Sequence, residues 1–492
     1  MSKALSVAFQ TLGCKLNQGE TGTIAAAFAN AGFSIDGGAQ DAELLVINTC
    51  AVTSKAEQKG RRLIRAALRQ NPCRCVIVTG CYAELERANI EALDDSVSCT
   101  TPGKRRLFVI PSAQNSRILD IPSRLTGENP RDETALRDAL ERLCGRADEV
   151  PSEDSCGDLE TFRFDMTGEF GDGKRRSRCF LKIQDGCDNS CAYCVVRAAR
   201  GKARSLPAEE ALERLAAVEN AGAAEAVLTG VNICQWNGLV NGVRTGLSGL
   251  LQRLLDGTKE INIRLSSLEP GVFTEDFFET LRHPRIRPHF HLSIQSGSSE
   301  TLKRMNRRYE LEAALDAVRR LREVKDDPFI SCDIITGFPG ETEERFLETL
   351  NFCEAADFAQ IHAFPFSRRR GTAAWDYRPR VPEREAEKRV QILNNLAAQN
   401  RKSYIGRWIG REVAAVCLSD AADARSRGCI ELLTANYLRV RARTRSDAGS
   451  GGFAVGKGQA ALCKITDFAG NGADAHGEII AAHAESRPCA SP

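Results

Sequence analysis

The sequence predicts an α/β protein in three parts: an N-terminal doubly wound α/β domain, a central partial (βα)6 barrel and a small C-terminal antiparallel β-barrel. Short apolar runs alternate with helical stretches from Leu5 to about Leu125, the alternation resumes from Arg178 to about Arg401, and short β-runs follow. The length agrees, because 492 residues exceed one hydrophobic core and suggest about three domains. The expected parts are residues 1–125, a linker or insertion at 126–176, residues 177–405, residues 406–469 and a tail at 470–492.

The N-terminal part is expected to contain a parallel sheet. Three apolar runs predict buried strands, and the stretches Glu20–Ala31 and Ala56–Arg69 between them have helical spacing. The predicted strands are Leu5–Phe9, Leu44–Ile47 and Cys75–Val78. Strands that alternate with helices in this way favour an open doubly wound sheet.

The central part is expected to be a parallel, partly closed barrel, because six βα units follow one another. The predicted strands are Cys179–Ile183, Ala226–Leu228, Ile261–Leu265, His289–Ser293, Ile330–Ile334 and Gln360–Phe364. In such a barrel the chemistry lies at the C-terminal ends of the strands. The C-terminal part has four short β-runs joined by turns, which predict a small antiparallel barrel. These runs are Glu412–Val416, Cys429–Leu433, Tyr437–Arg445 and Gly458–Thr466.

The composition says more about the cellular environment of the protein than about its binding partners. The 67 basic and 65 acidic residues nearly cancel, so a nucleic-acid surface must come from local segregation of charge. Nineteen cysteines without a charged-then-apolar leader indicate a reducing compartment. No apolar run approaches the ~18 residues that a membrane span needs. We therefore expect a soluble, cytoplasmic protein that does not engage a membrane.

The most specific motif is the CxxxCxxC run formed by Cys187, Cys191 and Cys194. Three thiolates at this spacing can hold three irons of a [4Fe-4S] cube, and the nearby sequence offers no obvious fourth ligand. One iron is left open, which is what coordination and reduction of S-adenosylmethionine require. The alternatives are a zinc site, which usually closes with four ligands, and three buried structural thiols.

With this run the chain resembles the radical SAM methylthiotransferases, which insert a methylthio group into tRNA or a ribosomal protein. The resemblance extends from Leu5 to about Phe468. It implies that the central part is a radical SAM barrel and that residues 406–469 form a TRAM-like RNA-binding barrel. It also implies an N-terminal methylthiotransferase domain with an auxiliary cluster, and hence two [4Fe-4S] clusters and S-adenosylmethionine as cofactors.

A second cysteine set follows the three predicted N-terminal strands. Cys14, Cys50 and Cys81 each come after a strand, and the C-terminal ends of parallel strands share one edge of a sheet. Spacing alone leaves open that these are ordinary buried cysteines. The surrounding residues are similar to the three signature blocks of the family's N-terminal domain. The resemblance therefore implies that these cysteines bind the second cluster.

The block around Cys14 also bears on the substrate. Gly13-Cys14-Lys15-Leu16-Asn17-Gln18 resembles the branch that acts on N6-threonylcarbamoyladenosine at position 37 of tRNA, on the 3′ side of the anticodon. The branches that act on isopentenyladenosine in tRNA or on a ribosomal protein are the enzymatic alternatives. An iron-sulfur electron carrier and a zinc-stapled RNA-binding protein are alternatives of another class. For the favoured branch, the resemblance implies radical activation of adenine C2, sulfur from the auxiliary cluster and a methyl group from a second S-adenosylmethionine.

Further residues match the family near the cofactor. Tyr193 precedes the third cysteine at a position that tends to lie beside the adenine of the cofactor. The other matches lie at predicted strand ends: Gly230, Asn232, Ser293, Gln295 and Gly337. Glu269 matches as well, and either binds substrate or caps the next helix. Two positions depart from the family, because Arg197 and Arg368–Arg370 stand where prolines are usual.

Two basic segments are candidates for RNA binding. Arg439, Arg441, Arg443 and Arg445 alternate with other residues, which puts four guanidinium groups on one face of a strand. Four like charges in line would repel unless an anion faced them, so we favour RNA over a merely solvated face. Residues 368–411 hold twelve Lys and Arg against four Asp and Glu. The expected partners are the tRNA anticodon stem-loop, a low-potential electron donor and a sulfur donor.

Overall fold

The structure is a computed structural model that describes residues 5–35, 42–70, 74–95, 105–128, 133–144, 178–419, 429–443, 455–470 and 474–482. These residues divide into two compact units. The first comprises the described residues up to Cys144 together with Lys182–Leu206 and Ser367–Thr372, and the second comprises Arg178–Leu181, Pro207–Phe366 and the described residues from Ala373 to Ala482. No helix among the described residues is long and apolar enough to span a bilayer.

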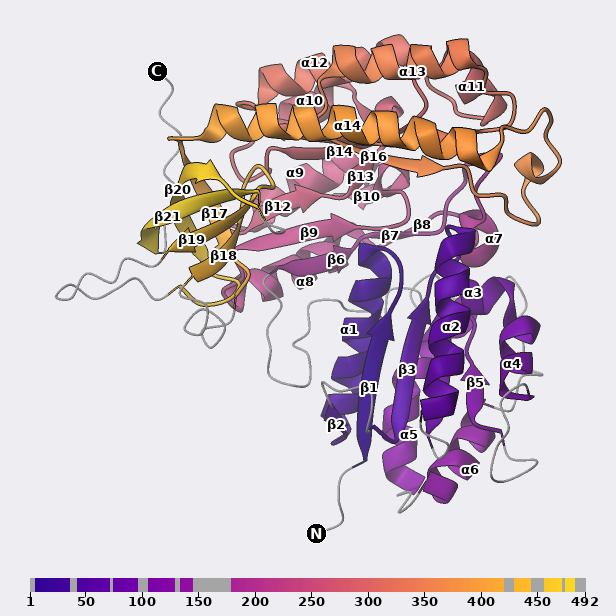
Figure 1. Cartoon of the computed structure of the whole chain (residues 1–492). Helices are drawn as coiled ribbons and strands as arrows, with labels where there is room; N and C mark the ends of the chain where they lie inside the picture. The colour runs from indigo at the N-terminus through magenta and orange to yellow at the C-terminus, as the bar shows by residue number, and fades with distance from the viewer. Residues whose placement is uncertain are drawn as a thin grey trace. The chain divides into compact units, whose positions relative to one another are not determined.

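The first unit is built on a five-stranded parallel sheet with the order β2-β1-β3-β4-β5. Its strands are β1 (Ser6–Thr11), β2 (Ser34–Ile35), β3 (Leu44–Thr49), β4 (Cys75–Gly80) and β5 (Leu107–Val109). The three predicted strands are confirmed as β1, β3 and β4, which lie side by side in the sheet (Figure 1). The two short strands at the edges were not predicted.

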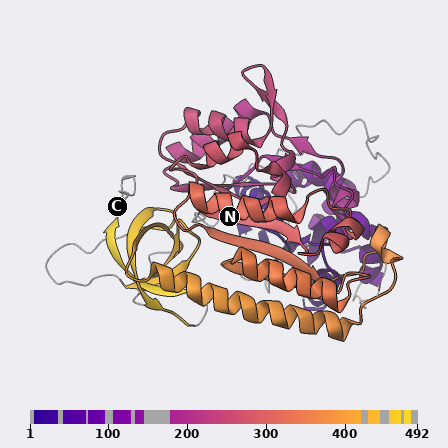
Figure 2. The same ribbon diagram turned by 90° about the horizontal axis from the view of Figure 1, so that it is seen from above.

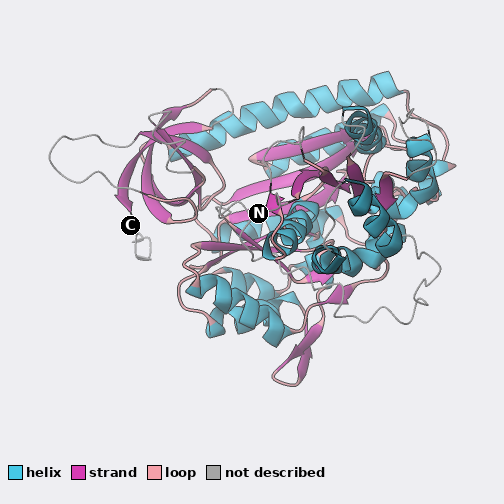
Figure 3. Cartoon of the chain, turned by 90° about the horizontal axis from the view of Figure 1, so that it is seen from below, coloured by secondary structure: helices cyan, strands magenta, loops and turns pink. Residues whose placement is uncertain are grey.

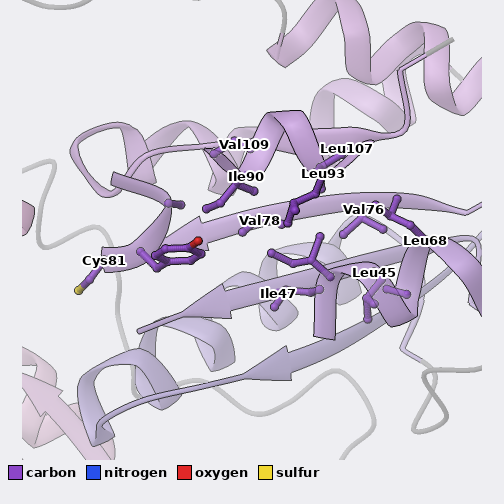
Figure 4. Close-up of a cluster of buried hydrophobic side chains, with 14 of the residues drawn as sticks. Leu45, Ile47, Leu68, Val76, Val78, Cys81, Ile90, Leu93, Leu107 and Val109 are labelled. Carbon is purple, nitrogen blue, oxygen red and sulfur yellow. The ribbon is translucent and has the colours of Figure 1, made fainter. Parts of the chain in front are cut away.

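Helices cover both faces of this sheet, which confirms the doubly wound architecture. One face packs against α1 (Lys15–Asn30), α5 (Asn115–Glu128) and α6 (Glu133–Cys144). The other packs against α2 (Ser54–Gln70), α3 (Cys81–Leu85) and α4 (Arg87–Asp95), as Figure 4 shows for ten labelled side chains. Neighbouring strand residues alternate between the two cores: Leu45 and Ile47 face one, and Val46 faces the other.

Helix α6 corrects the expected linker at 126–176. Its Leu136, Ala139 and Leu140 are buried in the same core as α1 and α5, so the first unit continues to Cys144. The physical reason is that Leu136, Ala139, Leu140 and Leu143 fall at i, i+3, i+4 and i+7 and form one apolar helical face. The rest of the expected linker, residues 145–177, lies outside the described residues.

The segment that carries the CxxxCxxC run belongs by its contacts to the first unit, although the prediction placed it in the barrel part. It contains β7 (Gln184–Asp185), α7 (Val196–Arg200) and β8 (Arg204–Ser205). Val195 and Ala199 are buried in the same core as Tyr82 of α3, and this contact accounts for the placement.

The second unit contains two sheets, with the orders β12-β9-β6 and β13-β14-β15-β16. Strands β13 to β16 pair in parallel, as do β9 and β12. The strands are β6 (Cys179–Lys182), β9 (Glu225–Thr229), β12 (Asn262–Leu265), β13 (Ser267–Leu268), β14 (His289–Gln295), β15 (Phe329–Thr336) and β16 (Gln360–Pro365). All six predicted strands are found. The additions are β13 and the hairpin of β10 (Gly238–Val240) and β11 (Val243–Thr245).

Helices alternate with these strands, as a (βα)6 arrangement requires. They are α8 (Ala208–Asn220), α9 (Leu247–Gly257), α10 (Glu275–Leu281), α11 (Ser299–Arg304), α12 (Leu311–Val324), α13 (Glu343–Ala356) and α14 (Glu383–Trp408). Short 3-10 helices are η1 (Ser112–Gln114), η3 (Ile233–Gln235), η4 (Pro270–Val272) and η5 (Ala373–Trp375). Helix α14 lies along β16 and leads into the C-terminal barrel (Figures 1 and 2).

The C-terminal barrel is closed, with the order β17-β18-β19-β21-β20. Its strands are β17 (Glu412–Cys417), β18 (Cys429–Thr434), β19 (Arg439–Arg443), β20 (Ala460–Phe468) and β21 (Ala475–Ala482), seen as a separate group of strands in Figure 3. The four predicted runs are confirmed. The predicted tail is wrong for Ala475–Ala482, which is the fifth strand, and the antiparallel prediction is wrong for β19 and β21, which pair in parallel.

Small inward-facing residues explain why β21 escapes prediction. A Cβ atom on Gly477 would lie 2.7 Å from Val440 Cγ1 and 2.8 Å from the Lys464 carbonyl oxygen, so the barrel leaves no room for a larger side chain there. Ala475 is also buried. Among the described residues of this strand, Ile479 is the one large residue buried on this face, and Ala475 and Gly477 before it interrupt the β-branched and aromatic pattern that marks a strand in a sequence.

Candidate functional site

Cys14, Cys50 and Cys81 lie at the C-terminal ends of the adjacent strands β1, β3 and β4. Cys14 caps α1, Cys50 follows β3 directly and Cys81 begins α3. A Cβ atom on Gly13 would lie 2.9 Å from Cys50 Cβ and 3.3 Å from Cys50 Sγ, so the Cys14 turn packs directly on Cys50. The parallel sheet thus brings three cysteines that are far apart in sequence to one edge.

The environment of these thiols suits a positively charged metal group. Burial raises the pKa of the Cys50 thiol to about 11; a backbone hydrogen bond from Val52 opposes this, and the nearby Cys81 and Cys14 raise the pKa further. Burial also raises the pKa of Cys81, while Arg200 opposes that shift. Three mutually repelling thiolates need a cation between them to ionise together.

Each cysteine set offers three thiolates, a donor set that can hold three irons of a [4Fe-4S] cube. Among the residues that the structure describes, no three His, Cys, Asp or Glu side chains lie close enough to hold one metal ion. In a [4Fe-4S] cube each thiolate binds a different iron, so the cysteines stand farther apart than around zinc.

Backbone hydrogen bonds help to hold the loop with Cys187, Cys191 and Cys194 in place. The Cys187 N–H donates to the Gly201 carbonyl at 3.1 Å, and the Cys194 N–H donates to the Cys191 carbonyl at 3.0 Å. Gly186 has a φ of +71°, and a Cβ atom there would lie 1.8 Å from the Lys202 carbonyl oxygen. Cys187 and Cys191 are half-buried and Cys194 is exposed.

Comparison with known proteins identifies the family. Two family models match: the Radical SAM superfamily over residues 181–353 and Uncharacterized protein family UPF0004 over residues 6–101. Threonylcarbamoyladenosine tRNA methylthiotransferase MtaB of Treponema pallidum is 40% identical, over 90% of this chain and 97% of the relative. The protein of that name from Bacillus subtilis is 33% identical, over 88% and 90%. This chain belongs to the radical SAM methylthiotransferase family.

A third relative of this methylthiotransferase is the tRNA-2-methylthio-N(6)-dimethylallyladenosine synthase of Thermotoga petrophila. It is 29% identical, over 84% of this chain and 86% of its own length. Family membership confirms the resemblance that the cysteine motifs indicated.

The methylthiotransferase contains a buried ion network that the sequence did not reveal. Arg200 Nε donates to Cys81 Sγ at 3.2 Å, and its Nη1 and Nη2 donate to the two carboxylate oxygens of Glu20 at 2.8 and 3.0 Å. Lys182 Nζ lies 2.6 Å from Asp185 Oδ2 and 3.3 Å from Glu20 Oε1. The four charged residues are all buried. Lys182 and Asp185 are three residues apart, but Glu20 and Cys81 are more than a hundred residues from Lys182 and Arg200, respectively, so no local pattern could have found the network.

The charges in this network stabilise one another. Burial would raise the pKa of Glu20, but Arg200 and then Lys182 outweigh it, so the net shift is downward. Burial opposes the shift of Asp185 as well, and Lys182 and then Arg200 lower its pKa well below its usual range. Although burial would lower the pKa of Arg200, the nearby Cys81, Glu20 and Asp185 raise it far above its usual value.

The other predicted cofactor residues divide between the two units. Tyr193 is half-buried within the cysteine loop of the first unit. In the second unit Asn232 is buried, and its side-chain oxygen accepts from the Cys234 N–H at 3.2 Å, which caps η3. Gly230 follows β9.

The remaining residues lie on β14 and after β15. Gln295 ends β14 with a φ of +72°, a conformation that costs energy in any residue but glycine and is common at functional sites. The Ser293 carbonyl accepts from Arg307 Nη2 at 2.8 Å. Gly337 has a φ of +71°, and a Cβ atom there would lie 2.4 Å from Ala386 Cβ of α14, so close packing explains this glycine.

Three further residues have partners that the sequence did not indicate. The Glu269 side chain makes no capping bond to η4 and instead pairs with Arg307 Nη1 at 2.8 Å, so the capping alternative is wrong. Arg197 Nη1 donates to the Asp188 carbonyl at 3.0 Å across the cysteine loop. Arg369 is buried and pairs with Glu57.

The arginine face of the barrel is described for three of its four members. Arg439 and Arg443 are exposed and Arg441 is half-buried, while Val440 and Ala442 between them are buried, so the alternation is confirmed. Arg445 lies outside the described residues. Glu431 is the register partner of Arg441 and Glu478 that of Arg443, which places both carboxylates on the same face. The protein therefore supplies counter-charges itself, and repulsion alone no longer requires RNA there.

Ion pairs also reduce the free positive charge of residues 368–411. Arg389 pairs with Glu341, Arg401 with Asp474, Arg407 with Asp327 and Arg411 with Asp326. These four of the twelve cations thus have partners within the fold.

Proposed function

We propose that this chain is a tRNA methylthiotransferase that converts N6-threonylcarbamoyladenosine at position 37 to its 2-methylthio form. The observation that carries the proposal is the 40% identity over 97% of the Treponema pallidum relative whose name states that activity. Lys15 and Asn17 next to Cys14 support the same branch. The partly exposed cysteine loop and the largely buried cysteine edge of the sheet support two separate sites.

Each cysteine set has a separate role in this proposal. Cys187, Cys191 and Cys194 would hold the cluster that binds S-adenosylmethionine, and Cys14, Cys50 and Cys81 would hold the auxiliary cluster. When bound, these groups supply a 5′-deoxyadenosyl radical, sulfur and a methyl group. The close turn at Gly186 fixes the first loop, and the sheet edge fixes the second set. Tyr193, Gly230, Asn232, Ser293, Gln295 and Gly337 are the residues we assign to cofactor contacts.

The domain assignment follows from these roles, with boundaries taken from the described elements. We assign the methylthiotransferase domain to the sheet that ends with α6 at Cys144, and the TRAM-like RNA-binding barrel to β17 through β21, ending at Ala482. Partners would be the tRNA anticodon stem-loop, a low-potential electron donor and a sulfur donor. Because tRNA is the substrate, we place the enzyme in the cytoplasm.

Separating the two half-reactions tests the proposal. Anaerobic reconstitution should load about eight irons, since two three-thiolate sets each complete a cube. Changing Cys187, Cys191 and Cys194 to Ala should remove about half of the iron and all formation of 5′-deoxyadenosine. Changing Cys14, Cys50 and Cys81 to Ala should also remove about half of the iron, but leave 5′-deoxyadenosine formation and abolish thiolation. Methylthio product made at the normal rate by the second variant would refute the assignment.

The same assay distinguishes the alternatives. tRNA that carries N6-threonylcarbamoyladenosine should be modified, whereas tRNA that carries isopentenyladenosine and ribosomal proteins should not. Zinc in place of iron after anaerobic purification would instead favour a zinc-stapled RNA-binding protein. Iron without cleavage of S-adenosylmethionine would favour an electron carrier.

A further inference from the structure

Arg200 contacts both parts of the first unit that carry the two cysteine sets. It is the last residue of α7, which begins directly after the loop with Cys187, Cys191 and Cys194. Its Nε donates to Cys81 Sγ at 3.2 Å. Its Nη2 donates to Asn17 Oδ1 at 3.2 Å, three residues after Cys14. Arg200 therefore contacts a thiol of the set on the sheet edge, and it lies on the helix that directly follows the loop with the other set.

The orientation of the guanidinium group is fixed by its other partners. Nη1 and Nη2 donate to the Glu20 carboxylate, and Nη1 also lies 3.3 Å from Asp185 Oδ1. Asp185 in turn accepts from the Gly186 N–H at 2.8 Å, next to Cys187. With both Nη groups engaged by carboxylates and Asn17, the Nε–H is the donor directed at sulfur. Lys182 adds a second cation, so the two cations balance the two carboxylates without any thiolate.

Because the Arg200 guanidinium is buried, its charge and its hydrogen bond act strongly on the Cys81 sulfur. Arg200 is 7% exposed, and Glu20 and Lys182 are each 1% exposed. A hydrogen bond and a positive charge in such a dry site act in a low effective dielectric. Hydrogen bonds to the sulfurs and the net charge near an iron-sulfur cluster are among the factors that set its reduction potential.

We propose that Arg200 is a positioning residue that raises the reduction potential of the cluster on Cys14, Cys50 and Cys81 through its hydrogen bond to Cys81. Through the same side chain, Arg200 connects this cluster site to the loop with Cys187, Cys191 and Cys194. The inference rests on the proposed function, because it requires a cluster at these cysteines. The donated hydrogen bond and the buried cation favour the reduced, more negative state of the cluster. The Glu20 and Asp185 carboxylates hold the guanidinium in place for that contact.

The test is a redox titration of the auxiliary cluster alone, followed by electron paramagnetic resonance. The full chain with Cys187, Cys191 and Cys194 changed to Ala provides the background, because only one cluster remains. In this background Arg200→Gln should lower the midpoint potential, whereas Arg200→Lys, which retains the charge, should lower it less. Arg74→Gln is the matched control. Arg74 is 1% exposed, donates from Nε to the Ala42 carbonyl at 2.9 Å, and precedes β4, the strand that Cys81 follows.

The control should fold less stably and leave the potential unchanged. If Arg200→Gln fails to fold, the double variant Glu20→Gln, Arg200→Gln removes a cation and a carboxylate together and should still show the lowered potential. A potential that is unchanged in the loaded Arg200 variants would overturn the inference and leave the proposed function intact. A background protein that binds no iron at all would overturn the proposed function instead.

Discussion

At the scale of single residues, the cysteine loop depends on one glycine. Gly186 combines a left-handed φ of +71° with a separation of 1.8 Å between a would-be Cβ atom and the Lys202 carbonyl oxygen. Gly222 has a similar φ of +80°, but nothing lies within 4 Å of its would-be Cβ atom. The two positions therefore separate the cost of backbone strain from the cost of a clash with backbone.

We expect Gly186→Ala to displace Cys187 and to lose most of the iron of the radical site, while Gly222→Ala keeps it. Strain at φ > 0 costs about 1–3 kcal/mol at either position, but only position 186 must also move a neighbouring carbonyl. Iron analysis and 5′-deoxyadenosine formation measure the outcome. Full iron loading in Gly186→Ala would mean that the loop relaxes around an added side chain.

The sequence predicted that Cys14, Cys50 and Cys81 follow three strands of one parallel sheet, and the structure places them after the adjacent strands β1, β3 and β4, while cluster binding by the six cysteines stays a prediction. It did not predict the residues that act on them. Arg200 lies 119 positions from Cys81 and 180 from Glu20, so its partners exist only in the folded chain. A buried arginine is also indistinguishable in sequence from the exposed Arg197 three positions earlier.

At the scale of secondary-structure elements, a buried ion cluster connects the strands of the second unit. Glu225 of β9 accepts from Arg264 of β12 through both carboxylate oxygens, each at 2.7 Å, and from Arg287 at 3.1 Å. Arg264 also donates to the Ala435 carbonyl at 3.0 Å, which links β12 to the turn before β19. Burial would raise the pKa of Glu225, but Arg264 and Arg287 lower it to about 2.

This shift predicts how the stability of the second unit depends on pH. A carboxyl group whose pKa falls from 4.5 to about 2 on folding stabilises the fold fully above pH 4.5, and loses that contribution as the pH falls toward 2. The contribution is about 3 kcal/mol. Glu225→Gln should destabilise the protein at pH 7, because it leaves two buried guanidinium groups without a counter-charge. The difference from the parent protein should narrow between about pH 5 and pH 3.

Thermal unfolding as a function of pH measures this effect. The control is Glu209→Gln, which breaks an exposed pair with Arg253 and should change the melting temperature little at any pH. A stability difference between the parent protein and Glu225→Gln that stays constant from about pH 7 to pH 3 would contradict the account of the buried cluster.

The arginine face of β19 makes a separate prediction about tRNA. If Arg439, Arg441 and Arg443 bind phosphates, changing all three to Gln should weaken binding and flatten its salt dependence by about 0.7 to 0.9 for each phosphate that is no longer neutralised. Changing Arg253, Arg319 and Arg320, which lie in surface ion pairs, to Gln removes the same charge elsewhere and should leave the slope unchanged. An unchanged slope in the first variant would mean that Glu431 and Glu478 already neutralise this face.

At the scale of the whole molecule, the order of elements was predictable and the boundaries between parts were not. Apolar periodicity predicted the parallel sheet, the six barrel strands and four strands of the C-terminal barrel. Packing between segments far apart in sequence placed Lys182–Leu206 and Ser367–Thr372 in the first unit. The unit to which such a segment belongs depends on packing between surfaces that are far apart in sequence. Val195 and Ala199, for example, pack into the core that contains Tyr82.

We propose that this chain methylthiolates N6-threonylcarbamoyladenosine and takes the sulfur from the site at Cys14, Cys50 and Cys81. The most direct test is mass spectrometry of tRNA nucleosides from cells that lack this chain, complemented with the parent protein or with the Cys14, Cys50 and Cys81 to Ala variant. We expect the 2-methylthio nucleoside only with the parent protein, and its unmodified precursor in the other two strains. A 2-methylthio nucleoside that persists without the chain, or loss of only the isopentenyladenosine derivative, would contradict the proposal.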